Sequence, residues 1–513
     1  MPSWRVWGDV ARANARLGDK PALVGPDGAA VSFAAFNNRV NRLNQALAGL
    51  GLAKGARVAL LSRNRPECLE VVGVAKSGLV VVPLNWRLTA GELAWQLDHC
   101  RPEVIVADAT HRGVIDSLRP GLGGVREFIG LDGGGDGWLD YRQVLDQAGD
   151  GEPDADVAPD DVLCLMYTSG TTGRPKGVAL SHGGLLANCR AVIAGLGLGE
   201  GDIGVAVMPL FHVGGLWYHL FPAFAAGGTS HLMTEFEPRA LLATLAGRRA
   251  THVHLVPTMI SALLDVPGVE TAELGALRLL YYAASAIPGP LLLRAMAVFG
   301  REVFLQSYGS TEGGVISVLS PADHARARQP GHERLLGSCG RPCRDLRIVG
   351  PAGQPLPAGA IGEIAVAGEA TMLGYWDDAE ASRLARPDGW LRTGDLGVLD
   401  EQGMLTIIDR KSDMIVSGGE NVYPREVEDA LFHDPDVLEA AVFALPDPHW
   451  VERVAAAVVL RPGVTAAPDD IIAGLRRQIA GYKCPKTVFL VDSLPKSGAG
   501  KVLRKELRRR FGG

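Results

Sequence analysis

Tyr167-Thr-Ser-Gly-Thr-Thr-Gly-Arg-Pro-Lys-Gly177 is the stretch of this sequence that says most about its fold and chemistry. It follows the apolar run 162–166, so a strand is expected to lead into a loop of glycine and hydroxyl residues. Such a loop can surround a phosphate chain, because glycines allow close approach and N–H and O–H groups donate to the oxygens. It is not a G-x-x-x-x-G-K-[ST] loop, since Pro175 stands where the second glycine would be. The stretch therefore predicts a nucleotide-phosphate site of another kind.

Bulk properties indicate a globular chain of several folding units. It has 513 residues, of which 47% are hydrophobic and 21% charged, and a formal net charge of −6. This mild acidity gives no reason to expect nucleic acid as a partner. The seven cysteines form neither a paired framework nor a cluster with histidine, which favours a reducing cytoplasm. The first residues lack a basic region followed by an apolar core, so no signal peptide is expected.

Residues 203–234 contain no Lys, Arg, Asp or Glu and are numerous enough to cross a bilayer. They also contain Pro209, Pro222, five glycines and three histidines. This composition favours a buried, broken segment around a pocket over a transmembrane helix. Peripheral contact with a membrane stays open, as does a homodimer.

The order of predicted elements indicates an α/β fold. Apolar residues at helical spacing follow Ser32, strands are expected at 58–61, 79–82 and 104–107, and Thr89 with Glu92 forms a capping box. Strand–helix–strand repetition predicts a largely parallel sheet covered by helices. A Gly/Asp/Pro-rich stretch at 121–161 separates two such units. After about residue 337, short alternating segments predict a small antiparallel or barrel-like region, and beyond Arg410 lies a compact tail unit.

Further motifs follow the first in a fixed order: Tyr308-Gly-Ser-Thr-Glu312, Arg392-Thr-Gly-Asp395, Asp409-Arg410 with Ser417-Gly-Gly-Glu-Asn-Val-Tyr-Pro424, and Pro495-Lys-Ser-Gly-Ala-Gly-Lys501. Together they resemble the acyl-adenylate-forming superfamily of acyl-CoA synthetases, luciferases and adenylation domains over almost the whole chain. The resemblance implies an AMP-binding N-terminal domain, residues 1–409, of two α/β subdomains plus a small β-barrel-like region. It implies a small, mobile α+β C-terminal lid domain, residues 410–513, with a hinge near 410–413. Ser412 stands where this family commonly has Asp or Lys.

The resemblance also implies a reaction: a carboxylic acid and ATP give an acyl-adenylate and pyrophosphate, and CoA then displaces AMP. Charge must be neutralised where the anions meet. The catalytic residues expected there are Lys501 as the adenylation lysine, Lys176 and Thr168 at the phosphates, Glu312 as the Mg²⁺ ligand, and His212. The remaining nucleotide contacts are expected at Ser169, Gly170, Thr171, Thr172 and Gly173 in the loop, Ala284, Ser285, Tyr308, Gly309, Ser310 and Thr311 around adenine and the α-phosphate, and Asp395 and Arg410 at the ribose. Gly418 and Gly419 are expected to meet the pantetheine of CoA after a domain rotation.

The acid is expected in a pocket that begins at Phe211-His-Val-Gly-Gly215. The predicted pocket residues are His212, Val213, Gly214, Trp217, Gly313 and Gly314. His212 can face the carboxylate, act as a gate, or be a buried, satisfied histidine. Neither a Phe-Asp motif for an amino group nor an arginine at 313–319 for a second carboxylate is present. An apolar monocarboxylic acid is therefore expected, with a medium- or long-chain fatty acid favoured.

Three alternatives stay open at this point. The first is an aryl- or cyclic-acid CoA ligase. The second is a fatty acyl-AMP ligase that loads a carrier protein, although the insertion typical of those enzymes is not evident between Arg410 and Tyr423. The third is a non-catalytic nucleotide-binding protein, against which the intact set of Lys176, Glu312, Asp395 and Lys501 weighs. The arginines of the basic helix expected at 501–510 are predicted to form mainly a solvated face.

Overall fold

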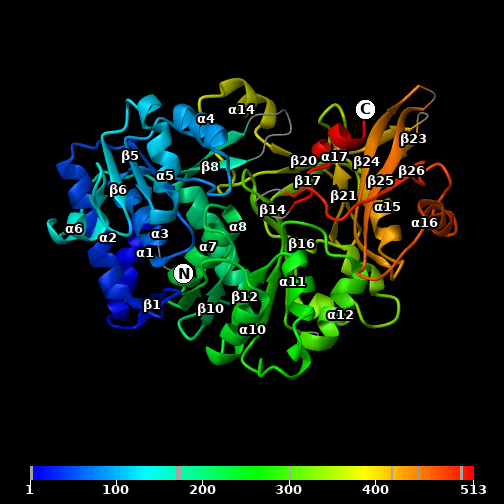
Figure 1. Ribbon diagram of the computed structural model, residues 1–513, viewed down its shortest axis with the longest axis horizontal. Helices are drawn as coiled ribbons and strands as arrows, with labels where there is room; N and C mark the ends of the chain where they lie inside the picture. Colours follow the sequence, from blue (N-terminus) through cyan, green and yellow to red (C-terminus); the bar gives the residue numbers. More distant parts are fainter. Residues whose placement is uncertain are drawn as a thin grey trace.

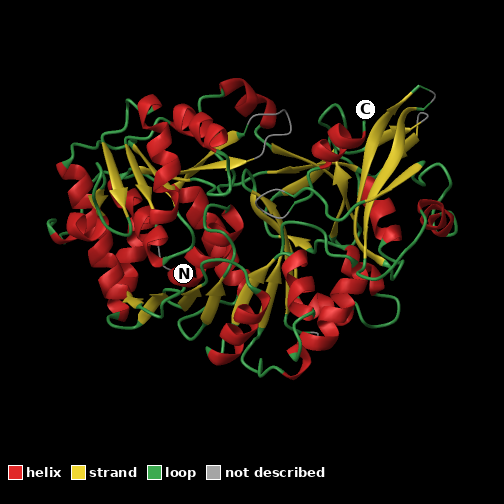
Figure 2. Cartoon of the chain, in the orientation of Figure 1, coloured by secondary structure: helices red, strands yellow, loops and turns green. Residues whose placement is uncertain are grey.

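The computed structural model describes residues 4–168, 175–300, 302–417, 420–448, 450–496 and 501–512. A large body contains two β-sheets with helices around them, and a smaller C-terminal unit lies at its side, at the right in Figure 1 and Figure 2. A short antiparallel sheet lies between the body and this unit. The predicted α/β class with a small C-terminal unit is confirmed.

The first subdomain is built on an eight-stranded sheet whose central strands are parallel. Its strands in spatial order are β19 (Gly374–Tyr375), β9 (Lys176–Ser181), β8 (Val162–Thr168), β4 (Val80–Pro83), β3 (Arg57–Leu61), β5 (Val104–Ala107), β6 (Glu127–Gly130) and β7 (Leu139–Asp140). Its helices are α2 (Phe33–Gly49), α3 (Pro66–Val72), α4 (Ala90–Cys100), α5 (Ala109–Leu118) and α6 (Tyr141–Asp146). Near it lie α1 (Trp7–Asn14) and α14 (Ala379–Ala385).

The second subdomain is built on a nine-stranded sheet. Its strands in spatial order are β16 (Arg341–Pro342), β15 (Gly314–Leu319), β14 (Phe304–Ser310), β13 (Leu279–Tyr282), β12 (His252–Leu255), β10 (Ile203–Ala206), β11 (Thr229–Leu232), β1 (Pro21–Val24) and β2 (Ala30–Ser32). Its helices are α7 (His182–Leu196), α8 (Val213–Gly215), α9 (Phe221–Ala225), α10 (Pro238–Gly247), α11 (Pro257–Leu264), α12 (Gly289–Phe299) and α13 (Pro321–Arg326). The N-terminal strands β1 and β2 therefore complete this second sheet, which the sequence did not indicate.

Two smaller sheets follow along the chain. The antiparallel sheet has the order β17 (Leu346–Val349), β18 (Gly362–Val366), β20 (Leu391–Leu399) and β21 (Leu405–Arg410). The C-terminal unit has β23 (Glu420–Val422), β22 (Ile415–Ser417), β25 (Val451–Leu460) and β24 (Val437–Asp447), with β26 (Thr487–Leu490) paired to β25. Its helices are α15 (Pro424–Leu431), α16 (Pro468–Leu475) and α17 (Arg504–Phe511).

Local signals explain several of these boundaries. The Ser32 hydroxyl accepts a hydrogen bond from the Ala35 amide and begins α2, while Thr89 and Glu92 form the predicted capping box of α4. The apolar face of α2, including Phe33, Phe36 and Val40, is fully buried. The capping residues thus fix where the helices begin, and apolar burial fixes which face packs inward.

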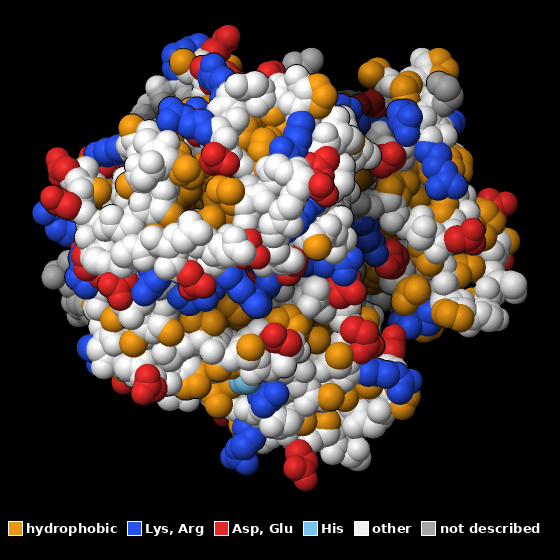
Figure 3. Space-filling model, turned by 60° about the vertical axis from the view of Figure 1, so that its left-hand side comes forward, with side chains coloured by type: hydrophobic (Ala, Val, Ile, Leu, Met, Phe, Trp, Pro, Cys, Tyr) orange, Lys and Arg blue, Asp and Glu red, His pale blue; other side chains and the backbone are white. Residues whose placement is uncertain are grey.

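The uncharged stretch 203–234 folds as predicted into a buried, broken segment. It forms β10, α8, a π-helix (Leu216–Leu220), α9 and β11. In the part of the chain that the structure describes, no helix is long and apolar enough to cross a membrane. In Figure 3, acidic and basic side chains are interspersed over the face shown.

Candidate active site

The ribose end of the site is assembled by pairing between β20 and β21. This pairing places Asp395 opposite Arg410, and Arg410 Nε lies 3.4 Å from Asp395 Oδ1. From β14, the Tyr308 hydroxyl donates a hydrogen bond of 2.6 Å to Asp395 Oδ2. Burial and the charge of Asp395 raise the pKa of Tyr308 well above its ordinary value, so the phenol stays a donor. Tyr308 and Arg410, two predicted nucleotide residues, therefore both contact the buried carboxylate of the third, Asp395.

The predicted adenine wall follows β13. Ala284 is half-buried, Ser285 is exposed, and Ala284 has a φ of 77°. This left-handed conformation favours glycine and costs an alanine about 1–2 kcal/mol. The backbone thus has the shape of a glycine position although the sequence lacks the glycine.

The phosphate end is framed by two paired strands. Thr168 ends β8 and lies opposite Lys176, which begins β9. Ser169, Gly170, Thr171, Thr172 and Gly173 lie outside the described residues. Lys176 Nζ lies 4.5 Å from the centroid of the Tyr375 ring, and the Tyr375 hydroxyl donates to Glu312 Oε1 at 3.2 Å. Tyr375, from β19, thus connects two predicted phosphate-site residues, and sequence reasoning missed it.

The surroundings of Glu312 fit a magnesium ion that is completed by substrate. Glu312 is half-buried, and within the described ranges no hydrogen bond involves its Oε2. Those same ranges contain no group of three or more His, Cys, Asp or Glu side chains able to hold a metal. Mg²⁺ at nucleotide sites takes one or two carboxylates plus phosphate oxygens. Glu312 would accordingly hold such an ion together with the phosphates of ATP.

Lys501, from the C-terminal unit, is half-buried among residues of the large body. Burial and the charge of Arg410 lower its pKa, while the carboxylates of Asp395 and Glu312 oppose this shift. Lys501 is therefore close enough to the ribose carboxylate and to the predicted metal ligand for both charges to act on its ammonium group. This is where negative charge develops when an acid attacks the α-phosphate.

His212 lies near Lys501 and is held by its own backbone. Its Nδ1 accepts a hydrogen bond of 3.3 Å from the Gly214 amide, which begins α8. Burial and the charge of Lys501 lower the pKa of His212 to about 3. The imidazole is therefore neutral at physiological pH.

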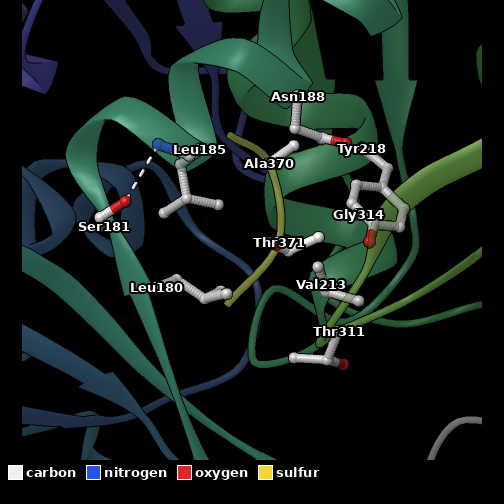
Figure 4. Close-up of a pocket in the computed structure, with 11 residues that line it drawn as sticks. Leu180, Ser181, Leu185, Asn188, Val213, Tyr218, Thr311, Gly314, Ala370 and Thr371 are labelled. Atoms are coloured by element: carbon white, nitrogen blue, oxygen red, sulfur yellow. Dashed lines mark hydrogen bonds between the residues drawn. The ribbon is translucent and has the colours of Figure 1, made fainter. Parts of the chain in front are cut away.

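A cavity with about 260 Å³ of empty space lies beside these residues. Figure 4 shows its wall of side chains from α7, β9 and the segments around residues 213–218, 311–314 and 370–371. Its lining residues are Leu180, Ser181, Gly184, Leu185, Asn188, Val213, Tyr218, Thr311, Gly314, Ala370 and Thr371. Predicted residues Val213, Gly314 and Thr311 are among them, whereas Tyr218, on the π-helix, was not anticipated. Tyr218 donates a hydrogen bond of 2.6 Å to the Ser310 carbonyl, which ties this wall to the nucleotide strand.

Some predicted pocket residues lie behind this wall. Trp217 is fully buried and packs edge-on against Phe221 at 5.3 Å, while the next residue, Tyr218, lines the cavity. The Gly214 carbonyl bonds the His254 ring at 3.1 Å. His212 and Gly313 also adjoin the cavity without being among its lining residues.

One arginine approaches the glycine wall from a distant part of the sequence. Arg344 donates to the Gly313 carbonyl, and a Cβ on Gly314 would lie 3.0 Å from its Nη2. The sequence contains no arginine at 313–319, but that segment alone does not indicate Arg344, which is close in space. Arg344 is not among the cavity's lining residues, so it braces the wall from outside.

Comparison with known families agrees with this geometry. The model of the AMP-binding enzyme family matches residues 10–376, and that of the AMP-binding enzyme C-terminal domain matches residues 426–501. The chain belongs to the AMP-binding enzyme family.

Similar AMP-binding enzymes include ligases for different acids. Feruloyl-CoA synthase of Amycolatopsis sp is 38% identical over 100% of this chain and 99% of its own. Long-chain-fatty-acid–CoA ligase FadD13 of Mycobacterium tuberculosis is 34% identical over 94% of this chain and 93% of its own. The crystal structure of the anthranilate CoA ligase AuaEII in complex with anthranoyl-AMP has a TM-score of 0.90 and 28% identity, covering 99% of this chain and 98% of that one. The predicted enzyme class, an AMP-forming acid–thiol ligase, is confirmed, and the family implies ATP and CoA as its substrates.

In this AMP-binding enzyme the region around Ser412 is anchored on both sides. Lys411 Nζ lies 2.9 Å from Glu363 Oε2 on β18, and the Lys411 amide donates to the Gly394 carbonyl at 2.9 Å. Asp413 instead pairs with Arg504 at 3.1 Å and Arg508 at 3.6 Å on α17. The side chains on either side of Ser412 thus contact different parts of the molecule, the large body and α17.

The C-terminal helix differs from its prediction. It begins at Arg504, not at Lys501, and Arg504 also forms a pair of hydrogen bonds of 2.7 and 2.9 Å with Glu428. The first arginines therefore hold α17 to its own domain, and the prediction of a mainly solvated face was wrong for Arg504. Gly418 and Gly419 lie outside the described residues.

Proposed function

We propose that this ligase activates a compact, apolar monocarboxylic acid, with an aryl-substituted acid as first candidate. The observation that carries the proposal is the small cavity next to Thr311 and Gly314, whose wall is built largely of apolar side chains such as Leu185 and Val213. Ligand pockets are mostly apolar with a few polar groups that fix orientation, so a small cavity with this wall suits a short, compact acid. The similarity to a feruloyl-CoA synthase and to an anthranilate CoA ligase supports this choice.

A medium- or long-chain fatty acid is the second candidate. A second cavity has Phe211 and Leu216 in its wall, together with apolar residues such as Leu60, Cys68 and Val72. Movement of Phe211 would provide room for a longer chain. The similarity to a long-chain-fatty-acid ligase supports this alternative.

In the first half-reaction, a carboxylate oxygen of the acid attacks the α-phosphorus of ATP. The new O–P bond replaces the bond to pyrophosphate, which leaves. Lys501 provides positive charge at the bridging oxygen, Asp395 and Arg410 hold the ribose, and Lys176 contacts the leaving phosphates. Mg²⁺ held by Glu312 would neutralise phosphate charge. Neutral His212 lines the approach of the acid.

In the second half-reaction, the C-terminal domain, residues 410–513, rotates about Ser412. Before the rotation Lys411 contacts the large body and Asp413 contacts α17, so Ser412 is the residue between the two anchors. Rotation at Ser412 would break the contact of Lys411 with Glu363. Lys501 withdraws, and the segment that contains Gly418 and Gly419 approaches the pantetheine. The thiol sulfur then attacks the acyl carbonyl carbon, and AMP leaves with the electrons of the broken C–O bond.

The test is a panel of C2–C18 and aryl acids, each assayed for AMP release with CoA and with an acyl carrier protein as acceptor. Higher kcat/KM for aryl acids with CoA is expected. A maximum at C12 or longer would favour the fatty-acid alternative, and transfer only to the carrier protein would favour a fatty acyl-AMP ligase. AMP release with none of the acids would refute the proposal. Cytoplasmic location, a homodimer and peripheral membrane contact stay predictions.

A further inference from the structure

The segment 372–376 bridges the two halves of the phosphate site. The Met372 amide donates to the Glu312 carbonyl at 2.7 Å, and the Trp376 amide donates to the Gly177 carbonyl at 2.7 Å. Between them, β19 pairs with β9, with Tyr375 opposite Val178. The backbone therefore fixes the distance between the strand that carries Lys176 and the turn that carries Glu312.

The side chain of Tyr375 repeats this bridge with charged groups. Its hydroxyl donates to Glu312 Oε1 at 3.2 Å, while its ring faces the Lys176 ammonium at 4.5 Å. A hydrogen bond to a carboxylate and a cation over a ring face are both attractive and directional. One half-buried phenol thus orients the cation that meets the leaving phosphates and the carboxylate that would meet their metal ion.

The contacts of the Tyr375 side chain affect both Glu312 and Lys176. With Oε1 occupied by the phenol, Glu312 presents Oε2 to a ligand. Lysine has a long side chain with many rotamers, so contact with the ring restricts Lys176 before ATP arrives. The backbone of Tyr375 is held separately, since its amide donates to Ser382 Oγ at 2.8 Å. Changes to the side chain can therefore be made without removing the backbone bridge.

We propose that Tyr375 is a positioning residue for the adenylation half-reaction, which presents Glu312 through its hydroxyl and Lys176 through its ring. The proposal rests on the function proposed above. It predicts two separable effects, because phenylalanine keeps the ring and loses the hydroxyl, whereas leucine loses both.

The experiment compares the wild type with Tyr375→Phe and Tyr375→Leu. Tyr141→Phe is the matched control, because Tyr141 on α6 also donates to a glutamate, Glu70, at 2.9 Å but lies in the first subdomain away from the site. Calorimetry measures the Kd of ATP with Mg²⁺ and with EDTA. Kinetics measure acid-dependent pyrophosphate exchange and, separately, thioester formation from supplied acyl-adenylate. Thermal unfolding reports general stability.

For Tyr375→Phe, we expect weaker binding of ATP with Mg²⁺ by about tenfold, or about 1.4 kcal/mol, and unchanged binding with EDTA. For Tyr375→Leu, binding with EDTA should also weaken. Thioester formation from supplied acyl-adenylate should stay within twofold (roughly 0.4 kcal/mol) of the wild type in both variants. The Tyr141→Phe control should leave every ATP measurement unchanged.

Wild-type ATP binding in Tyr375→Phe, or an equal loss in both half-reactions, would overturn the positioning role. Parallel losses in Tyr141→Phe and Tyr375→Phe would overturn it too, by assigning the effect to stability. Failure of the proposed function is distinguishable, because the wild type itself would then show no acid-dependent exchange although it binds ATP.

Discussion

The ion pair between Lys411 and Glu363 lies beside the pivot, so its removal should shift the balance between the two half-reactions. Lys411 Nζ and Glu363 Oε2 are 2.9 Å apart, and the side chains are 60% and 16% exposed. Glu363 also accepts a hydrogen bond from the Gly394 amide and is therefore fixed to the large body. We call the arrangement in which Lys501 lies at the nucleotide the adenylation arrangement. In Lys411→Gln this arrangement loses the ion pair, while the local backbone hydrogen bonds remain.

The expected magnitude is small and follows from exposure. Ion pairs at the surface contribute about 0.2–1 kcal/mol, and the low exposure of Glu363 places this pair toward the upper value. Since about 1.4 kcal/mol corresponds to a factor of ten, the population of the adenylation arrangement should fall by a factor of up to about five. The effect should vanish at high salt, because the Debye length shortens to about 3 Å at 1 M.

The assay is the ratio of two rates: acid-dependent pyrophosphate exchange, and thioester formation from supplied acyl-adenylate. Lys411→Gln should lower this ratio by up to about fivefold at low salt. At about 1 M NaCl the wild-type ratio should approach that of the variant. Arg16→Gln is the control, because it removes an exposed pair with Glu200 (2.7 Å) in the large body.

An unchanged ratio in Lys411→Gln would refute the assignment of this pair to the adenylation arrangement. So would an equal change in Arg16→Gln, because the effect would then reflect net charge. A wild-type ratio that does not respond to salt would contradict the electrostatic origin of the effect.

Three further predictions follow from the site and its histidines. Lys501→Ala should abolish acid-dependent pyrophosphate release and spare thioester formation from supplied acyl-adenylate; undiminished release would remove Lys501 from its role. Tyr308→Phe loses the 2.6 Å hydrogen bond to Asp395, and a hydrogen bond to a charged group contributes about 1.5–3 kcal/mol. Calorimetry should therefore show an ATP Kd raised about tenfold or more. An unchanged Kd would contradict a role for this hydrogen bond in ATP binding. Burial lowers the pKa of His254 to about 4, so between about pH 6.5 and pH 4 the unfolded state binds a proton that the folded state does not. In this window the free energy of unfolding should fall as the pH falls, by at most about 1.4 kcal/mol per pH unit, and above it His254 should have no such effect. Urea unfolding at pH 7 and pH 5 should show a smaller difference for His254→Gln than for the wild type, and an equal difference would contradict the assignment.

Local signals in the sequence predicted much of the fold. The caps at Ser32 and Thr89 gave the starts of α2 and α4, and the apolar run 104–107 coincides with β5. The start of α17 was misplaced because a run of basic residues carries no cap. Long-range pairing was also not predictable: β1 and β2 join a sheet whose other strands begin at residue 203.

For the site too, local sequence signals predicted some residues, and those that depend on long-range pairing were missed. Lys176, Glu312, Asp395 and Lys501 lie in motifs whose composition reveals their chemistry, and the structure brings the last three close together. Tyr375 was missed because its role depends on register with a strand almost 200 residues earlier in the sequence. Tyr218 was missed because a π-helix changes which residue of the run 216–220 faces the cavity. Composition can reveal a charge, but a bridging aromatic side chain becomes evident only from pairing.

The geometry around His212 favours one of the roles that its sequence context left open. Its Nδ1 accepts from the Gly214 amide, so the single proton of the neutral ring is on Nε2. A ring with a pKa of about 3 provides no positive charge for a carboxylate at neutral pH. In the proposed mechanism that charge comes from Lys501, which would withdraw with the C-terminal domain after the first half-reaction. His212 belongs to the large body and can donate from Nε2 in both arrangements, which suits a carboxylate in the first half-reaction and an uncharged acyl carbonyl in the second. The proposed mechanism would therefore separate a mobile positive charge, needed once, from a fixed neutral donor that serves both steps.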